Sequence, residues 1–157
     1  MTSETALINV AVRLVSGNRV TSRLDGGKEA NVADDLFDTV RDRLLRSHNW
    51  NFATKSIELA RSATTPVLDF DYGYAAPSDW LRTIAVHDDA TGITNIKYRE
   101  ELLNGQRVLL ASTEKVFLRY VARVTDPNLW PADFASAFEL AIARDMAVPI
   151  ANSNTLR

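Results

Sequence analysis

The spacing of apolar residues changes twice along this chain of 157 residues, and the change limits the folds open to it. Up to about residue 48, apolar residues recur every three or four positions, as in helices with one buried face. Over about 53–124, short β-branched and aromatic runs alternate with turn residues, as in antiparallel strands. A helical spacing returns after Pro131. Because the strands follow one another without intervening helices, the order predicts an α+β fold and not an alternating βαβ fold.

The helical part is expected over residues 3–48 and 131–157, packed as a helical bundle. A first helix is expected over 3–16, capped by Thr2 or Ser3 and stopped at Gly17. Its buried face is expected to hold Leu7, Val10, Ala11, Leu14 and Val15. The last helix is expected to run from Pro131 to about residue 148, with Pro149 interrupting it.

A second helix is expected over residues 28–47, where apolar residues repeat every four positions at Val32, Leu36, Val40 and Leu44, with Phe37 beside them. Three aspartates lie early in this helix and three arginines lie late, an order that complements the helix dipole. The arginines are Arg41, Arg43 and Arg46. Their surface is a candidate contact with a neighbouring subunit.

The β part, over about 53–124, is expected to form a segregated antiparallel sheet or a small β-sandwich inserted between the second and last helices. Asn104-Gly105 is a strong hairpin signal. Strands are expected over 53–61, 80–86, 93–99, 107–111 and 115–124. In the last of these, Val116, Leu118, Tyr120 and Ala122 share one face.

The composition restricts the classes of function. The net charge of −2 argues against tight binding of duplex DNA, which uses a basic patch. The absence of cysteine excludes a thiol nucleophile and the usual zinc sites. No apolar run approaches the roughly 18 residues of a membrane span, and the N-terminus lacks the order of a signal peptide. We therefore expect a soluble intracellular chain that does not contact a membrane.

Few residues are candidates for catalysis. His48 is expected to stabilise a helix end, and His87 to lie in a solvated turn. Ser78 has no G-x-S-x-G context, and Gly26-Gly27 lacks a phosphate-loop frame. The sequence thus predicts no enzyme, no catalytic residue, no cofactor and no metal.

The segment YGYAAPSDWLRT (72–83) is better explained by turn chemistry at Pro77-Ser78-Asp79. Arg82 is expected to pair with a carboxylate, either Asp79 or one on a neighbouring subunit. Trp50, Trp80 and Trp130 are expected to anchor either the core or an interface.

Four stretches in order resemble one family: ALINVAVRLVSGNRVTS (6–22), EANVADDLFDTVRDRLLRSHNWNFATK (29–55), FDYGYAAPSDWLRTIAVHD (70–88) and LRYVARVTDPNLWPADFASAFELAIARDMAVPIANSN (118–154). They are similar to the head-to-tail adaptors of tailed bacteriophages, also called tail tubular protein A. The likeness covers nearly the whole chain as a single adaptor domain, 1–157. Ala76 departs from it, since the family often has leucine there.

The resemblance implies a structural virion protein of the head–tail neck, assembled in the host cytoplasm. Adaptors of this family form a ring, typically of twelve copies, below the portal protein and above a tail nozzle or tail tube protein. DNA passes through the lumen without sequence-specific binding, and no cofactor or catalytic residue is implied. Candidate interface residues are Arg41, Arg43, Arg46, Trp50, Trp80, Arg82 and Trp130. Two alternatives stay open: a stopper or tail-completion protein, and a small cell-wall hydrolase with a carboxylate pair near Asp79.

Overall fold

The computed structural model describes residues 3–154, and the chain divides into two compact units. The helical unit contains the described residues 3–48 and 124–154, with α1 (Glu4–Val15), α2 (Lys28–Ser47) and α3 (Ala132–Asn154). The β unit, residues 49–123, contains six strands in two antiparallel three-stranded sheets. The expected α+β fold is confirmed, and the strands are inserted between α2 and α3.

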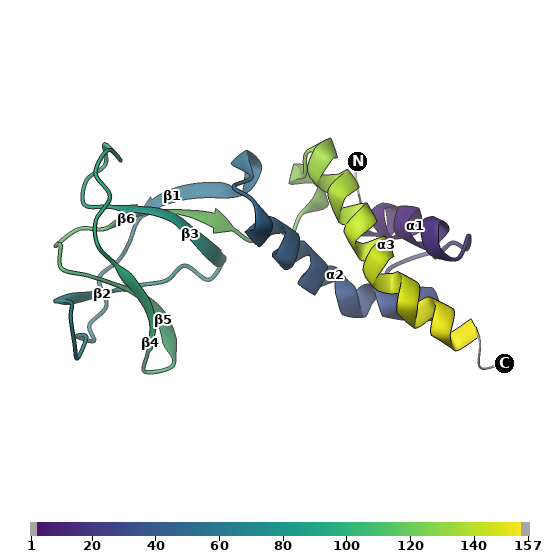
Figure 1. Cartoon of the computed structure of the whole chain (residues 1–157), viewed down its shortest axis with the longest axis horizontal. Helices are drawn as coiled ribbons and strands as arrows, with labels where there is room; N and C mark the ends of the chain where they lie inside the picture. The colour runs from purple at the N-terminus through teal and green to yellow at the C-terminus, as the bar shows by residue number, and fades with distance from the viewer. Residues whose placement is uncertain (1–2, 155–157) are drawn as a thin grey trace. The chain divides into compact units, whose positions relative to one another are not determined.

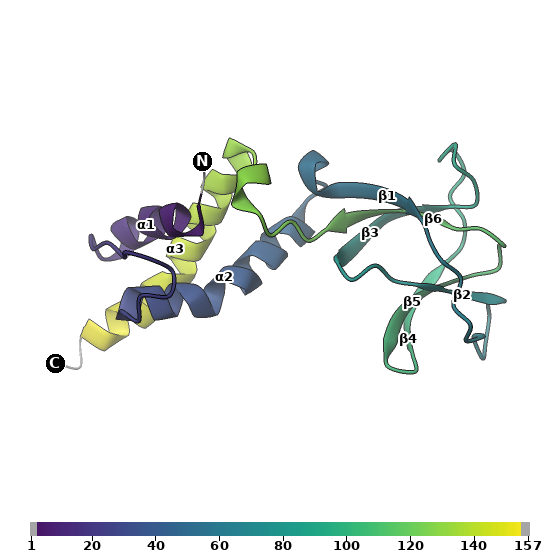
Figure 2. The ribbon, with the colours of Figure 1, turned by 180° about the vertical axis from the view of Figure 1, so that it is seen from behind.

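In the helical unit, α3 packs against both α1 and α2 (Figures 1 and 2). An aromatic cluster joins α2 to the start of α3. The ring of Phe37 lies 4.8 Å from that of Phe138, and Trp130 lies 5.0 Å from Phe134 and 5.1 Å from Phe138, measured between centroids. Because aromatic rings bury large apolar areas and gain from edge-to-face contacts, this cluster is the centre of the helical core.

The ends of α1 match the sequence prediction, but its buried face does not. The hydroxyl oxygen of Ser3 accepts a hydrogen bond from the Ala6 amide, and Gly17 adopts a left-handed φ of 73°. The expected buried residue Leu14 is exposed, while Ile8 and Val12 are buried. The face is rotated because several contiguous apolar residues in this helix allow two stripes, and packing against α3 selects one of them.

The same rotation occurs in α2. Its bounds are confirmed, yet the buried residues are Ala30, Ala33, Phe37, Val40, Arg41 and Leu45. Of the expected stripe, Val40 and the adjacent Phe37 are fully buried, whereas Val32, Leu36 and Leu44 are half-buried. The contact face of α2 therefore combines two small alanines with Phe37, Val40 and Leu45.

The expected interruption of the last helix at Pro149 is wrong, because α3 continues through it to Asn154. Proline removes one backbone hydrogen bond from a helix. Packing on both sides of the proline opposes that loss: Met146 and Ile150 are buried. In addition, the Lys28 ammonium donates a hydrogen bond of 2.9 Å to the Ile150 carbonyl.

A buried asparagine on α1 fixes the connection between α1 and α2. The Asn9 side-chain amide donates to the Val20 carbonyl at 3.0 Å, and its oxygen accepts from the Val20 amide at 2.8 Å. Val20 is itself buried. The two bonds satisfy the backbone groups of a buried loop residue, which would otherwise lose hydration without replacement.

Replacing Asn9 by alanine is expected to lower the free energy of unfolding by about 2–3 kcal/mol, because both backbone groups of Val20 lose their partners. Asn31→Ala is a suitable control, since Asn31 is exposed and its side chain makes one long hydrogen bond of 3.3 Å. Urea denaturation followed by circular dichroism measures both changes. An equal, small effect of the two substitutions would contradict the role given to Asn9.

In the β unit, one sheet has the order β1 (Thr54–Glu58), β6 (Phe117–Ala122), β3 (Trp80–His87). The other has the order β2 (Tyr72–Ala75), β5 (Gln106–Ala111), β4 (Arg99–Leu103). After β1, the chain leaves β6 and pairs with β2, where the Ser62 amide donates to the Gly73 carbonyl and the Ala75 amide to the Ala60 carbonyl. The segment following β1 therefore links the two sheets, as strands that change sheets do in small sandwiches (Figure 1).

The β4–β5 hairpin turns at Asn104 (φ 51°) and Gly105 (φ 79°), as the sequence predicts. The strand expected over 93–99 is wrong, however. The two-residue turn pairs Leu103 with Gln106, so the strand extends back from Leu103 only to Arg99. Residues 93–98 contain an isolated bridge and no strand, because they lie in the connection that follows β3.

Both sheets contribute to one core. The face predicted for the last strand is confirmed, since Val116, Leu118, Tyr120 and Ala122 are all buried. They pack in one cluster with Leu59, Tyr74, Trp80, Val86, Leu109 and Ala111. The alternation of inward and outward side chains along β6 thus determines which side of its sheet is covered. Among the described residues, no helix has both the length and the apolar character needed to cross a membrane.

Candidate interaction surfaces

The three arginines predicted as an interface on α2 have different environments. Arg41 is buried, and its guanidinium lies 2.8 Å from both Asp38 and Asp42. Arg43 is half-exposed and pairs with Asp145 of α3 at 2.6 Å. Arg46 is exposed. Two of the three charges therefore pair with carboxylates of the helical unit itself.

The three tryptophans are also divided. Trp80 and Trp130 are buried in the cores of their own units, and each indole N–H has a partner: Thr83 Oγ1 at 3.1 Å and the Val124 carbonyl at 3.0 Å. Their burial favours the core alternative over the interface alternative. Trp50 is half-buried beside Phe52, with ring centroids 6.2 Å apart.

The expected pairing of Arg82 with Asp79 does not occur. Arg82 donates to the side-chain oxygen of Asn49, and Asp79 instead accepts from Lys55 at 2.6 Å and from the Tyr120 hydroxyl at 2.9 Å. The Trp80 amide donates to the Pro77 carbonyl, which closes the predicted turn. Asp79 therefore lies between β1 and β6, where it links the turn to both strands.

These contacts shift the pKa values of Asp79 and Tyr120. Partial burial opposes ionisation of Asp79, but hydrogen bonds from Lys55 and Tyr120 and the charge of Lys55 hold its pKa below the usual range. Burial, together with the hydrogen bond to Asp79 and its charge, raises the pKa of Tyr120 to about 12. A general acid in glycoside hydrolysis needs a raised carboxyl pKa. The environment of Asp79 has the opposite effect.

Tyr120→Phe is expected to lower the free energy of unfolding by about 1–2 kcal/mol near neutral pH, because a hydrogen bond to a charged carboxylate is lost. The folded-state pKa of Asp79 is depressed, so this stabilisation is present above its unfolded pKa and is lost as pH falls through the folded pKa. Urea denaturation over a series of pH values, down to the lowest at which the chain stays folded, measures the difference. Tyr98→Phe is the control, since Tyr98 is partly exposed on the same unit. A loss independent of pH would contradict the pairing.

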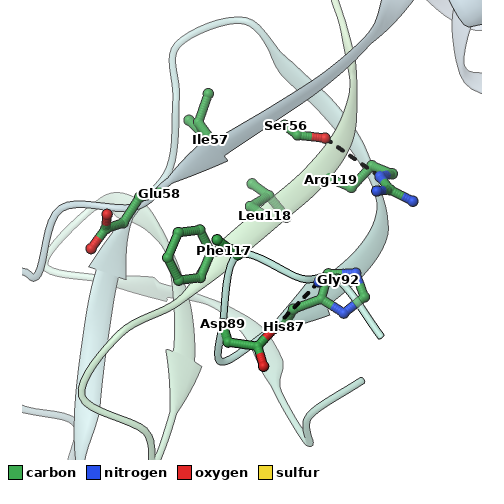
Figure 3. A pocket seen from close by; sticks show the side chains of 10 residues that line it. Ser56, Ile57, Glu58, His87, Asp89, Gly92, Phe117, Leu118 and Arg119 are labelled. Atoms are coloured by element: carbon green, nitrogen blue, oxygen red, sulfur yellow. Dashed lines mark hydrogen bonds between the residues drawn. The ribbon is translucent and has the colours of Figure 1, made fainter. Parts of the chain in front are cut away.

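A pocket of about 150 Å³ lies on the β1–β6–β3 sheet (Figure 3). Its apolar lining is Ile57, Phe117 and Leu118. In Figure 3, Glu58 lies across Phe117 from His87 and Arg119. His87 is buried, so its expected position in a solvated turn is wrong. It ends β3, and the turn begins only after it.

The polar groups around this pocket do not form a catalytic relay. The His87 Nδ1 lies 2.9 Å from the Thr94 carbonyl, which can only accept, so Nδ1 carries a hydrogen and donates it. The buried Nε2 has no hydrogen-bond partner among the described residues. Ser56 accepts from Arg119 and not from histidine. Hydrogen bonds from Thr91 lower the pKa of the Asp89 carboxyl, which caps its own turn.

Other expected or possible sites have structural explanations. His48 is exposed at the end of α2. The neighbouring carboxylates Asp69 and Glu101 both pair with Arg99, at 3.0 and 3.3 Å. Within residues 3–154, no group of three or more histidine, aspartate or glutamate side chains is arranged to hold a metal ion.

The most unusual surface is on α3, which is apolar on two opposite sides. Phe134, Phe138, Ile142, Met146 and Ile150 face the core. At 100° per residue, a second row formed by Leu140, Ala147, Val148 and Ala151 lies on the opposite side of the helix. Leu140 and Val148 are 64% and 65% exposed. Asp133 and Arg144 lie on the same side of the helix, so this second row is an apolar surface flanked by charges and a candidate contact surface.

The second row of α3 borders a groove of about 580 Å³ between α3 and the end of α1. Leu14 and Val15 of α1 line one side, with Leu14 60% exposed. The α3 side is lined by Leu140, Ala143, Arg144, Ala147, Ile150 and Ala151. We call this the α1–α3 groove. Sequence reasoning missed it because it assigned Leu14 to the core and treated α3 as having one buried face.

Comparison with known proteins adds no assignment: no family model matches the chain, and no curated protein is significantly similar to it.

Proposed function

We propose that this chain is a structural subunit of a bacteriophage virion, a head-to-tail adaptor that forms a ring below the portal and leaves a channel for DNA. The proposal takes its specific role from the resemblance of four ordered stretches to that family. Its physical support is the α1–α3 groove, an apolar surface that is exposed to water on an isolated subunit.

Exposed apolar area of this kind is typical of surfaces that bind other proteins. Leu14, Leu140 and Val148 present most of their side chains to solvent on one unit. A ring needs each subunit to bury surface against two neighbours, and the same subunit must also contact the proteins above and below it. The groove supplies apolar surface for one such contact.

The environments of the candidate catalytic groups support a structural role over a hydrolase. Asp79 has a lowered pKa, and Lys55 and Tyr120 already occupy its oxygens. Glu100 accepts from the Thr83 hydroxyl at 2.6 Å. Each of these carboxylates holds strands together.

The test is assembly with the portal protein encoded in the same genome. Mixing the chain with the assembled portal is expected to give particles with an additional ring of density on one face of the portal, visible by cryo-electron microscopy. The chain alone can remain monomeric, because docking can precede lateral assembly. Failure to dock on the portal, together with lysis of peptidoglycan that Asp79→Ala abolishes, would replace the proposal with the hydrolase alternative.

A further inference from the structure

An exposed leucine lies in the connection between α1 and α2. Leu24 is 79% exposed, although the turn around it is well ordered by hydrogen bonds. The Asp25 carboxylate accepts from the amides of Thr21 and Gly27, at 2.8 and 2.9 Å. Arg23 points inward, with its guanidinium 4.4 Å from the centre of the Phe37 ring. The turn therefore presents Leu24 in a fixed position and loses little conformational entropy when Leu24 binds.

The surroundings of Leu24 are acidic. Arg23 is bound by Asp34 at 2.5 Å and Glu4 at 3.1 Å, and Asp38 lies 3.7 Å from it. Three carboxylates thus surround one guanidinium, and the Asp25 carboxylate adds a fourth negative charge beside Leu24 in the sequence. We call Leu24 and this rim the Leu24 knob.

The α1–α3 groove has the complementary character. The side chain of Arg144, which lines it, is 70% exposed, and Arg13 is exposed beside Leu14. Asp145 pairs with both Arg43 and Arg144, so this side of the groove has two arginines for one carboxylate and keeps an excess of positive charge. Burial raises the pKa of Glu139, and the positive charge of Arg13 partly opposes this rise. An apolar groove with exposed arginines suits an apolar side chain surrounded by carboxylates.

The knob and the groove lie at opposite ends of α1. Glu4 and Thr5 border Leu24, whereas Leu14 and Val15 line the groove. Ten residues of helix separate these positions by about 15 Å. Each subunit therefore carries two different, complementary surfaces, as a head-to-tail ring requires; a two-fold dimer would instead need one self-complementary surface.

We infer that the Leu24 knob of one subunit docks in the α1–α3 groove of the next subunit. This contact rests on the proposed function, since it is the lateral contact of the proposed ring. The occupant of the groove is thus a second copy of this chain, with Leu24 between Leu14 and Leu140 and the acidic rim facing Arg13 and Arg144.

Cysteine cross-linking tests the contact directly, because the natural chain has no cysteine. A disulfide needs Cα atoms within about 7 Å, so its formation reports close approach. Mixing Leu24→Cys subunits with Leu140→Cys subunits under mild oxidation, in the presence of the portal, is expected to give a cross-linked dimer of the two variants. A subunit carrying both substitutions is expected to give a ladder of higher oligomers. Leu129→Cys replaces Leu140→Cys in the control, since Leu129 is 63% exposed on the same unit.

Cross-linking of Leu140→Cys with itself would show two-fold packing and overturn the inference. Portal-bound rings that form without a cross-link between positions 24 and 140 would overturn it too, and would show that the groove holds a different partner while the adaptor function stands. Failure of the natural chain to form any ring on the portal would instead contradict the proposed function.

A mixing experiment gives an independent readout. Leu24→Asp and Leu140→Asp subunits each keep one of the two surfaces intact. Each variant alone is expected to need at least a tenfold higher subunit concentration to form rings. A mixture of the two is expected to stop at dimers, because only one knob and one groove per pair remain intact. Leu129→Asp should assemble as the natural chain does. Both test positions are exposed, so circular dichroism spectra should match that of the natural chain. Rings formed by either variant alone would contradict the contact.

Discussion

Pairing between β1 and β6 is the constraint on which both units depend. Thr54 lies opposite Val121, and the register continues to Glu58 opposite Phe117. This pairing brings the two ends of a segment of 75 residues, 49–123, close together. For a flexible loop of that length, the length-dependent part of the entropic cost of closure alone is roughly 4 kcal/mol. Because the folded β unit closes its own ends, the helical unit does not bear that cost, and the aromatic cluster of Phe37, Trp130 and Phe138 suffices to join α2 to α3.

Local signals were the parts of the fold that the sequence predicted well. Ser3 and Gly17 lie at the ends of α1, and Asn104-Gly105 forms the β4–β5 turn. The buried face of β6 is also the expected one. Each of these features depends only on residues that are neighbours in the sequence. The errors came from choices that tertiary packing makes. On α1 and α2, more than one row of residues is apolar enough to form the buried face. Packing against α3 selects the row that is buried. Pro149 is tolerated because Ile150 is buried beyond it.

Charged residues were harder to place than apolar ones. Asp34, Asp38 and Arg41 were interpreted as a dipole pattern with free charge for a neighbour. In the structure, Asp34 and Asp38 surround Arg23, and Arg41 is buried against Asp38 and Asp42. No sequence signal identifies Arg23 as the partner, because it comes from a loop eleven residues before Asp34. The same holds for Asp79, whose partners Lys55 and Tyr120 are distant along the chain.

Both units leave large apolar side chains exposed, but their cores are built differently. In the β unit, both sheets share one core, and the charged groups at its turn are paired within the unit. In the helical unit, α1 and α2 pack against α3 but leave Leu140 and Val148 exposed. Leu140 borders the α1–α3 groove, so the proposed lateral contact would cover it. In the proposed ring, contact with a neighbouring subunit would remove part of this exposed apolar area from water.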